Sequence, residues 1–318
     1  MSDELIKATE VSLVQRRPDL IDEGQAFANA SLSKATRKAI KADWQVFDEW
    51  CAAQHVQAMP ASSETAGAFL TEQARTKKVA TLVRYRATIG KLHKLQGHTS
   101  PFANEHVKAI LEGIRRVKGV AQHQKKPMTV ALASAKRVGP RAVRDRAILL
   151  FGLATSFRGQ ELCALNVEDL EWVAEGVIVH QRRSKTDQLG VGRAVGVPLV
   201  GHEHCPVRAL LDWLEVLKDD RGPLFRGYLC NGAIGRRRMV PRTIGVIVKS
   251  VVEDPADYGA HSLRAGYVTT ARQVGQDWAS IMAQTGHKRL ETVQRYDRST
   301  IDPFKASKVA EVFKKEKP

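Results

Sequence analysis

Apolar side chains recur every three or four residues through the first third of the chain, the spacing of amphipathic helices. The first run starts at Ser33, and two later runs end at Gly97 and Gly119. The pattern predicts a small helical bundle over residues 26–118, preceded by a loosely ordered arm at 1–25. The apolar positions that define its four helices are Ile40, Trp44, Phe47, Cys51, then Ala66, Phe69, Leu70, then Val79, Leu82, Ile89, Leu92, Leu95, and finally Val107, Ile110, Leu111, Ile114, Val117.

After this bundle the pattern changes to short alternating runs and then back to helical spacing. Residues 119–130 are polar and basic without an apolar period, so they are predicted to be a linker. Residues 131–318 are expected to form a second domain that returns to helices from Pro206 onward. The fold class is therefore mainly α with a small β-sheet (α+β). The expected segments are a helix at 144–153 and strands at 169–173, 177–180 and 194–199, the first two joined by a turn at Glu175-Gly176.

The charge of the chain narrows the class of partner. Among 318 residues, Lys and Arg number 50 against 34 Asp and Glu, a formal net charge of +16, which favours a polyanion. No apolar run approaches the roughly 20 residues of a membrane span, and the start Met1-Ser2-Asp3-Glu4 has no secretory signal. Four scattered cysteines fit reduced thiols, so we expect a cytoplasmic, nucleoid-associated protein with no membrane partner. Nucleic acid is the favoured partner.

Four short segments of the second domain carry side chains suited to phosphate chemistry. They supply arginines, a lysine, two histidines and a tyrosine in one order along the chain. Each segment alone is a weak signal, and the whole set in order is a strong one. The segments are Ala154-Thr155-Ser156-Phe157-Arg158-Gly159-Gln160-Glu161-Leu162, Arg183-Ser184-Lys185-Thr186, Gly259-Ala260-His261-Ser262-Leu263-Arg264-Ala265-Gly266, and Thr285-Gly286-His287, with Tyr296 nine residues after His287 in Gln294-Arg295-Tyr296.

This order resembles the tyrosine recombinase (phage integrase) family, especially its Cre and simple integrase branches. That family places an Arg before a Glu-Leu pair, a Lys in a β-hairpin, a His-x-x-Arg pair, a His or Trp, and then a Tyr. The resemblance implies an N-terminal helical core-binding domain and a C-terminal catalytic domain. Only some 30 residues precede the first predicted helix, so no separate arm-binding domain is expected. The catalytic set implied by the resemblance is Arg158, Lys185, His261, Arg264, His287 and Tyr296.

The chemistry of DNA strand transfer explains why these residue types suit the task. Attack on a phosphodiester builds negative charge on the non-bridging oxygens, and a guanidinium stays charged and forks onto such oxygens. By the resemblance, Arg158 and Arg264 clamp the phosphate, and His287 adds a hydrogen bond. His261 lies three residues before Arg264 on a predicted helix, so both side chains project from the same face and can reach one phosphate.

The resemblance also assigns the proton transfers. A tyrosine with an ordinary pKa of about 10 is almost wholly protonated at neutral pH, so the attacking Tyr296 needs a base or a cationic pocket. His261 is the candidate base, and Lys185 is the candidate general acid for the leaving 5′ oxygen. Because Arg182 and Arg183 adjoin Lys185, a neighbouring basic residue stays open as the acid. The 3′-phosphotyrosyl product would retain the bond energy, so no cofactor, ATP or metal is expected.

Structural explanations compete with several of these assignments. Arg158 could instead form a cap or salt bridge with Glu161. The run Arg236-Arg237-Arg238 fits a solvated face as well as a phosphate contact. His202-Glu203-His204-Cys205 lacks a distant second pair of ligands, so we do not expect a zinc site. Four further tyrosines compete with Tyr296, namely Tyr85, Tyr228, Tyr258 and Tyr267.

The expected partners are double-stranded DNA with specific sites and further copies of the chain. The resemblance implies a homotetramer on DNA, in which a last helix with Phe304, Val309, Val312 and Phe313 docks onto a neighbouring protomer; packing on its own domain is the alternative. An accessory directionality factor is a further candidate partner. The candidate DNA contacts of the first domain are Arg84, Arg86, Lys91, Lys94, Arg115, Arg116 and Lys118.

Two other functions use the same DNA partner. A type IB topoisomerase would relax supercoils with the same residues, and a catalytically silent protein would only bind DNA. The intact set of six side chains argues against a silent protein, and the small helical first domain favours recombination over a dedicated topoisomerase. The function predicted from the sequence is site-specific recombination or integration of DNA.

Overall fold

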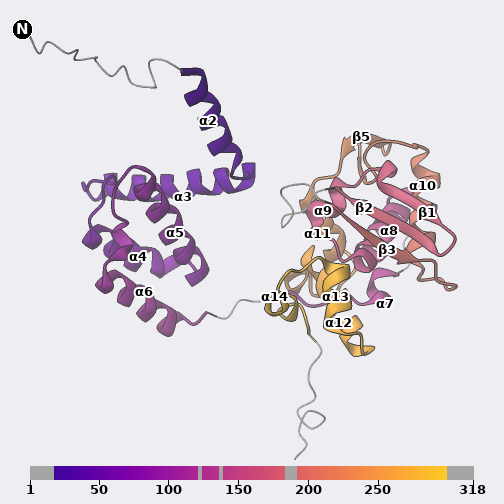
Figure 1. Ribbon diagram of the computed structural model, residues 1–318. Helices are drawn as coiled ribbons and strands as arrows, with labels where there is room; N and C mark the ends of the chain where they lie inside the picture. Colours follow the sequence, from indigo (N-terminus) through magenta and orange to yellow (C-terminus); the bar gives the residue numbers. More distant parts are fainter. Residues whose placement is uncertain (1–17, 121–123, 136–138, 183–191, 299–318) are drawn as a thin grey trace, which may run out of the picture. The chain divides into compact units, whose positions relative to one another are not determined.

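The computed structural model describes residues 18–120, 124–135, 139–182 and 192–298. The chain divides into two compact units, Met1–Gln122 and His123–Pro318 (Figure 1), so the division falls within the stretch predicted as a linker. None of the described helices combines the length and apolar character needed to cross a bilayer.

The first unit is a helical bundle. Three of its described helices begin at a short polar side chain that caps them: the Ser33 and Ser62 hydroxyls and the Asn104 side chain accept hydrogen bonds from backbone N–H groups of the first turns. The first described helix begins at Pro18, inside the segment expected to be a loose arm. The helices are α2 (Pro18–Ala30), α3 (Lys34–Ala53), α4 (Ser63–Thr76), α5 (Val79–Leu95) and α6 (Glu105–Lys118), with a short 3₁₀ helix η1 (Pro101–Ala103) before α6.

Aromatic and aliphatic side chains at the predicted positions form the core of this bundle. Phe47 and Phe69 are fully buried and meet edge to face with ring centroids 5.0 Å apart. Leu82 and Ile89 of α5 are buried beside them. The periodic pattern wrongly predicted core positions in the last turns of α5 and α6, where Leu95 is 68% exposed and Val117 is 88% exposed. The helical period continues to the helix ends, whereas the apolar neighbours do not.

The second unit is mainly helical and its core lies around α8 (Pro140–Thr155). Helix α8 packs against α10 (Pro206–Leu217) and α12 (His261–Gln273) (Figure 1). Buried side chains such as Phe151 and Trp213 belong to this core. The other helices are short. They are α7 (Val130–Ala133), α9 (Gly159–Ala164), α11 (Pro241–Lys249), α13 (Trp278–Thr285) and α14 (Leu290–Gln294), with 3₁₀ turns η2 (Val167–Asp169) and η3 (Pro255–Asp257).

A three-stranded antiparallel sheet covers this helical core. Its order is β1 (Leu170–Val173), β2 (Gly176–Gln181) and β3 (Arg193–Pro198), which confirms the predicted strands. The register pairs Leu170 with Val179 and Val179 with Val195, so one face carries buried valines against the helices. A second hairpin, β4 (Arg226–Tyr228) with β5 (Ile234–Arg238), was not predicted, because its short arginine-rich strands lack an alternating apolar pattern.

The residues just before α7 are packed onto the second unit rather than forming connecting chain. The backbone N–H of Lys126 donates to the Asp257 carbonyl at 2.9 Å, and its Nζ lies 2.8 Å from Asp257 Oδ2. The N–H of Met128 donates to Ser262 O at 2.8 Å. Gly266 of α12 permits this close approach, since a Cβ there would lie 2.0 Å from Met128 O. The chain that connects the two units therefore ends before residue 126, earlier than the predicted linker of 119–130.

Candidate active site

Arg264 lies at the centre of the candidate site and is 1% exposed. Its Nη1 donates to Ser156 O at 2.7 Å and its Nη2 donates to Thr285 O at 2.6 Å, so α12 joins the end of α8 to the end of α13. Burial, and then the charge of Arg158, lowers the pKa of Arg264 to about 10, which still leaves a cation at neutral pH. Its Nε–H is buried without a partner among the described residues. A donor in that state suits an incoming phosphate oxygen.

Arg158 precedes α9 and is held by Glu161. The Arg158 backbone N–H donates to Glu161 Oε2 at 2.8 Å, and Arg158 Nη1 donates to Oε1 at 2.6 Å. Glu161 is buried, and although burial opposes its charge, the hydrogen bonds and charge of Arg158 outweigh that effect and lower the pKa of the carboxyl. The salt bridge weighed as the alternative is thus present. It orients a guanidinium whose charge also lowers the pKa values of Arg264 and His287.

His287 is a neutral imidazole in a cationic surrounding. Burial, followed by the charges of Arg264 and Arg158, lowers its pKa to about 3. The ring's Nδ1 lies 2.7 Å from the Thr285 hydroxyl, and its Nε2 lies 3.0 Å from Arg264 Nη2. Since a guanidinium only donates, Nε2 accepts from Arg264 and Nδ1–H donates to Thr285. Gly286, with φ +69°, makes the left-handed turn after α13 that brings His287 to this position.

Tyr296 follows α14 and its ring lies among these groups. The ring centroid is 5.5 Å from Arg264 Cζ, 5.3 Å from the ring of His287 and 6.3 Å from the ring of His261. His261 is exposed at the start of α12, and Tyr296 is half-buried. The hydroxyl of Thr269 donates to Tyr296 O at 3.3 Å and fixes the turn that carries it. The structure therefore gathers the predicted His261, Arg264, His287 and Tyr296.

The four rival tyrosines lie in other surroundings. Tyr85 is buried in the core of the first unit, and Tyr258 packs against the main core of the second. Tyr228 is covered by Arg144, whose Cζ is 4.8 Å from the ring centroid. The Tyr267 hydroxyl donates to Gln276 Oε1 at 3.3 Å. All five tyrosines of the chain are in the described part, and the ring contacts with Arg264 and the two histidines belong to Tyr296.

Lys185 lies outside the described residues, as do Arg183 and the predicted tail segment from residue 304 to 313. The strands on either side of the Lys185 loop, β2 and β3, are described. Five of the six predicted catalytic side chains are therefore placed. Arg182, the described basic neighbour of Lys185, forms a 2.5 Å ion pair with Asp169.

The other sequence signals in this unit have structural partners. Arg238 donates to the carbonyls of Cys163 and Leu165 at 2.7 Å, which ties β5 to the end of α9, whereas Arg236 and Arg237 are exposed. The Cys205 thiol, next to the two histidines considered as metal ligands, accepts from backbone N–H groups at 3.4 Å and caps α10.

The candidate DNA contacts of the first unit divide into two groups. Arg84 forks onto Asp43, with hydrogen bonds of 2.9 Å from Nε and 2.8 Å from Nη2, so this guanidinium has an internal partner. Lys118 Nζ donates to the carbonyls of Ala74 and Lys77, and Arg115 pairs with Glu112 at 3.2 Å. The exposed members of the predicted set include Arg86, Lys91, Lys94 and Arg116.

Arg193 is a residue that sequence reasoning missed. Arg193 is the first residue of β3 and lies next to the site as a cation. Burial lowers the pKa of its guanidinium. Its charge lowers the pKa values of His287 and Arg264. Neither spacing nor motif marks it, because an arginine at the start of a strand is ordinary. Only the fold brings it to α13.

Comparisons with known proteins identify the family of the chain. The model of the phage integrase family matches residues 121–302. An integrase/recombinase xerD homolog from Selenomonas ruminantium is 33% identical over 276 residues, covering 82% of this chain and 80% of that protein. Tyrosine recombinase XerC from Mycobacterium leprae is 30% identical over 186 residues, 55% of this chain and 56% of that protein. The chain therefore belongs to the phage integrase family of tyrosine recombinases, enzymes that cleave and rejoin DNA through a tyrosine.

Solved structures show the same fold. A lambda integrase (75-356) dimer bound to a COC′ core site matches with a TM-score of 0.61 at 16% identity, covering 88% of this chain and 95% of that chain. The Tn1549 transposon integrase in complex with circular intermediate DNA matches with a TM-score of 0.58 at 15% identity, covering 89% and 96%. The family named from the sequence and its α+β fold are confirmed, and recombination is favoured over the topoisomerase and silent alternatives.

Proposed function

We propose that this recombinase cuts specific double-stranded DNA sites with Tyr296 and joins the cut strand to a second site. The observation that carries the assignment is the position of the Tyr296 ring, 5.5 Å from the buried Arg264 guanidinium and 5.3 Å from His287. A nucleophile beside a fixed cation and a donor with no partner is the arrangement that phosphoryl transfer requires.

In the first step the Tyr296 oxygen attacks the scissile phosphorus. The phenolic proton passes to His261, the P–O5′ bond breaks, and Lys185 protonates the leaving 5′ oxygen. A 3′-phosphotyrosyl bond remains. In the second step a 5′ hydroxyl of the partner strand attacks that phosphorus, and the proton transfers run in reverse. One ester is exchanged for another in each step, so the reaction needs no ATP, metal or cofactor.

The arginines act on the negative charge that develops on the phosphate. Arg264 offers its Nε–H, and Arg158 offers the part of its guanidinium that Glu161 does not hold. In other phosphoryl-transfer enzymes one such arginine contributes on the order of 10³ to 10⁵ in rate. His287 is neutral, so it adds no charge of its own, and a hydrogen bond from it to the phosphate would use the Nδ1–H that Thr285 accepts in the protein without DNA.

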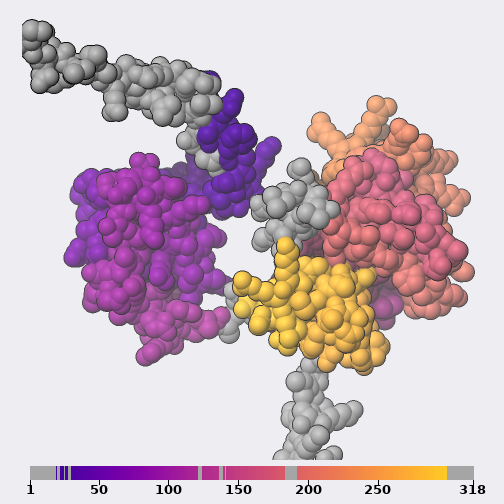
Figure 2. All heavy atoms as spheres, in the orientation of Figure 1, coloured from indigo at the N-terminus to yellow at the C-terminus, as the bar shows by residue number. Residues whose placement is uncertain are grey.

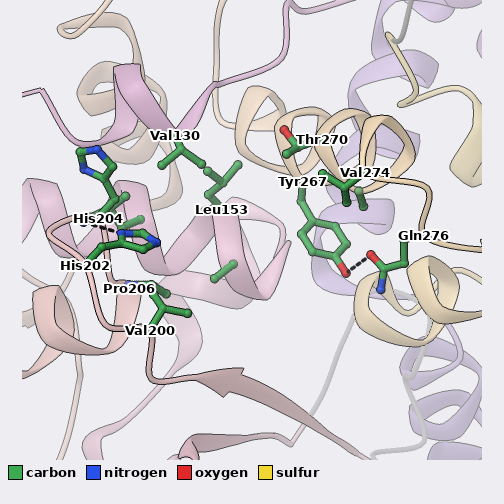
Figure 3. Close-up of a pocket in the computed structure, with 13 residues that line it drawn as sticks. Val130, Leu153, Val200, His202, His204, Pro206, Tyr267, Thr270, Val274 and Gln276 are labelled. Carbon is green, nitrogen blue, oxygen red and sulfur yellow. Dashed lines mark hydrogen bonds between the residues drawn. The ribbon is translucent and has the colours of Figure 1, made fainter.

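The synaptic assembly is proposed to be a homotetramer joined through the C-terminal tail. The second unit has an apolar cavity of about 330 Å³ between α7, α8, the loop before α10, and α12 (Figure 3). Leu153, Val200 and Val274 line it, and Tyr267 lies on its α12 side. Twenty residues follow Arg298, and the apolar members of 304–313 match the cavity in chemistry. The proposed occupant is this segment of a second copy.

A cross-linking experiment tests the tail. A Val274→Cys chain mixed with a Val312→Cys chain on DNA should give a covalent dimer with a bismaleimide reagent, while each single variant alone reports the background from Cys230. A cross-link formed only within one chain carrying both changes would place the tail on its own domain and contradict the proposal.

A plasmid assay tests recombination itself. The site is first selected from random DNA duplexes by binding, which does not require catalysis. A supercoiled plasmid with two such sites should then yield deletion products when the sites are in direct orientation and inversion products when they are inverted. Relaxation without strand exchange would instead indicate a topoisomerase.

A further inference from the structure

The side chain of Arg193 connects three elements that surround the candidate site. Its Nε donates to Gln181 Oε1 on β2 at 2.7 Å. Its Nη1 donates to the carbonyl oxygens of Ala283 and Gln284, at 3.1 and 3.0 Å. Both belong to the last turn of α13, where carbonyl groups have no hydrogen-bond partner within the helix. Arg193 therefore fixes the last turn of the helix that leads into His287.

Packing confirms that Arg193 belongs to this junction. Its guanidinium lies over the ring of Phe157, with Cζ 5.3 Å from the centroid, and Phe157 directly precedes Arg158. Gly286 also lies against this guanidinium, because a Cβ there would come within 2.9 Å of Arg193 Cζ. The turn before His287 and the guanidinium thus share one tightly filled space.

The placement also fixes the base of the hairpin that carries Lys185. Gln181 and Arg193 are register partners, the last residue of β2 and the first of β3. Their side chains are hydrogen-bonded, so the two ends of the loop are tied together and to α13. Lys185 itself lies outside the described residues, and the inference concerns only the anchor of its loop.

The charge of Arg193 is costly to hold at this position. No ion pair forms with it in the described part of the chain, and burial lowers its pKa. Neutral caps could satisfy the α13 carbonyls without that cost. A half-buried cation held near the other cations of the candidate site points to a functional contribution. Among the described residues, the charged and titratable groups that act on the His287 ring are Arg264 from α12, Arg158 just before α9, Arg193 from β3 and the neighbouring Tyr296.

We propose that Arg193 is a positioning residue, which sets His287 and the base of the Lys185 hairpin against the scissile phosphate and adds its charge to the field there. The inference rests on the proposed strand-transfer function. It predicts two separable consequences. Loss of the hydrogen bonds from the Arg193 guanidinium should slow cleavage with little effect on DNA binding. Loss of its charge should change the pKa of His287.

The test compares Arg193→Gln and Arg193→Lys with Arg272→Gln. Arg272 is a matched control, because its Nη1 also donates to a carbonyl, that of Gln276, at 2.7 Å, and its Cζ also lies over a ring, 4.5 Å from that of Trp278. It anchors the start of α13 instead of its end. The readouts are single-turnover cleavage of a nicked duplex carrying the selected site, affinity for the same duplex, and the His287 titration followed by NMR on the protein without DNA.

We expect Arg193→Gln to raise the pKa of His287 by about half a unit or more, because a nearby cation is removed. Its cleavage rate should fall at least roughly tenfold, since small misplacements of a catalytic group have large effects on rate. Arg193→Lys should keep the low pKa and still lose rate, and Arg272→Gln should change neither. An unchanged His287 titration in Arg193→Gln, or a rate loss no larger than that of Arg272→Gln, would overturn the proposal. If the wild type also fails to cleave, the proposed function fails, while the DNA-free titration still decides the role of Arg193.

Discussion

The guanidinium of Arg264 and the ring of Tyr296, 32 positions apart in the sequence, face each other with Cζ 5.5 Å from the ring centroid. Helix α12 carries Arg264, whose guanidinium is held by the carbonyls of Ser156 and Thr285, and Thr269 of the same helix holds the Tyr296 backbone. Nucleophile and cation are therefore both anchored to α12. The last described elements, yellow in Figure 2, form one continuous part of the surface of the second unit.

Replacing Arg264 should separate stability from catalysis. Arg264→Ala leaves two buried carbonyl oxygens without donors, so we expect a destabilisation of about 3–5 kcal/mol, typical of breaking a buried charged network. Arg264→Lys keeps the charge without the fork and should fold better, yet adduct formation should still fall by roughly 10² or more. Calorimetry of the full chain and single-turnover cleavage give the two quantities. Near-wild-type cleavage by Arg264→Lys would contradict a role for the forked geometry.

Glu161 should act through Arg158. In Glu161→Gln the carboxylate that accepts from Arg158 Nη1 and N is replaced by an amide of similar shape, so the guanidinium loses its charged anchor. We expect a cleavage loss of about 10- to 100-fold, similar to loss of a supporting partner in other sites. Because the folded-state pKa of Glu161 is lowered, its contribution to stability is present above the unfolded pKa and is lost as pH falls through the folded pKa. If Glu161→Gln loses as much stability as the wild type when the pH is lowered, this carboxylate is not the group responsible for that loss.

The neutral His287 predicts a dependence of stability on pH. Its pKa falls from 6.5 to about 3 on folding, so between these values the unfolded chain binds a proton that the folded chain does not. Its stabilising contribution is therefore complete above pH 6.5 and decreases as the pH falls toward 3. One such group contributes a slope of about 1.4 kcal/mol per pH unit. Urea unfolding between pH 4 and 7 should show a shallower slope in His287→Asn than in the wild type; equal slopes would exclude His287 as the group responsible.

Two glycine substitutions test the packing of the segment before α7. In Gly266→Ala the new Cβ would lie 2.0 Å from Met128 O, so the segment must move and we expect a loss of roughly 2 kcal/mol or more. Gly245→Ala is the matched control, since it lies inside α11 and its Cβ would meet only ordinary contact at 3.8 Å. Helix propensity predicts a gain of about 0.5–1 kcal/mol there. Equal melting temperatures for the two variants would contradict this packing.

The sequence predicted what depends on local periodicity. Helices α3 to α6 and strands β1 to β3 carry regular apolar patterns, and His261 with Arg264 share a helix face because they are three residues apart. The family order supplied the remaining catalytic candidates. Long-range partners were not predictable: Arg84 meets Asp43, and Arg193 reaches α13, because separate elements pack together. The β4–β5 hairpin was missed because its short strands lack an alternating apolar pattern, and the distant carbonyls that Arg238 meets are not marked in the sequence.

The central claim is that Tyr296 is the nucleophile, and trapping of the covalent adduct tests it most directly. A nicked duplex bearing the selected site loses its leaving strand after cleavage, so the phosphotyrosyl adduct accumulates on the protein. Wild type should form the adduct, with mass spectrometry locating the nucleotide on Tyr296, and Tyr296→Phe should bind the duplex with unchanged affinity and form none. Adduct in Tyr296→Phe, or a nucleotide found on another tyrosine, would contradict the account.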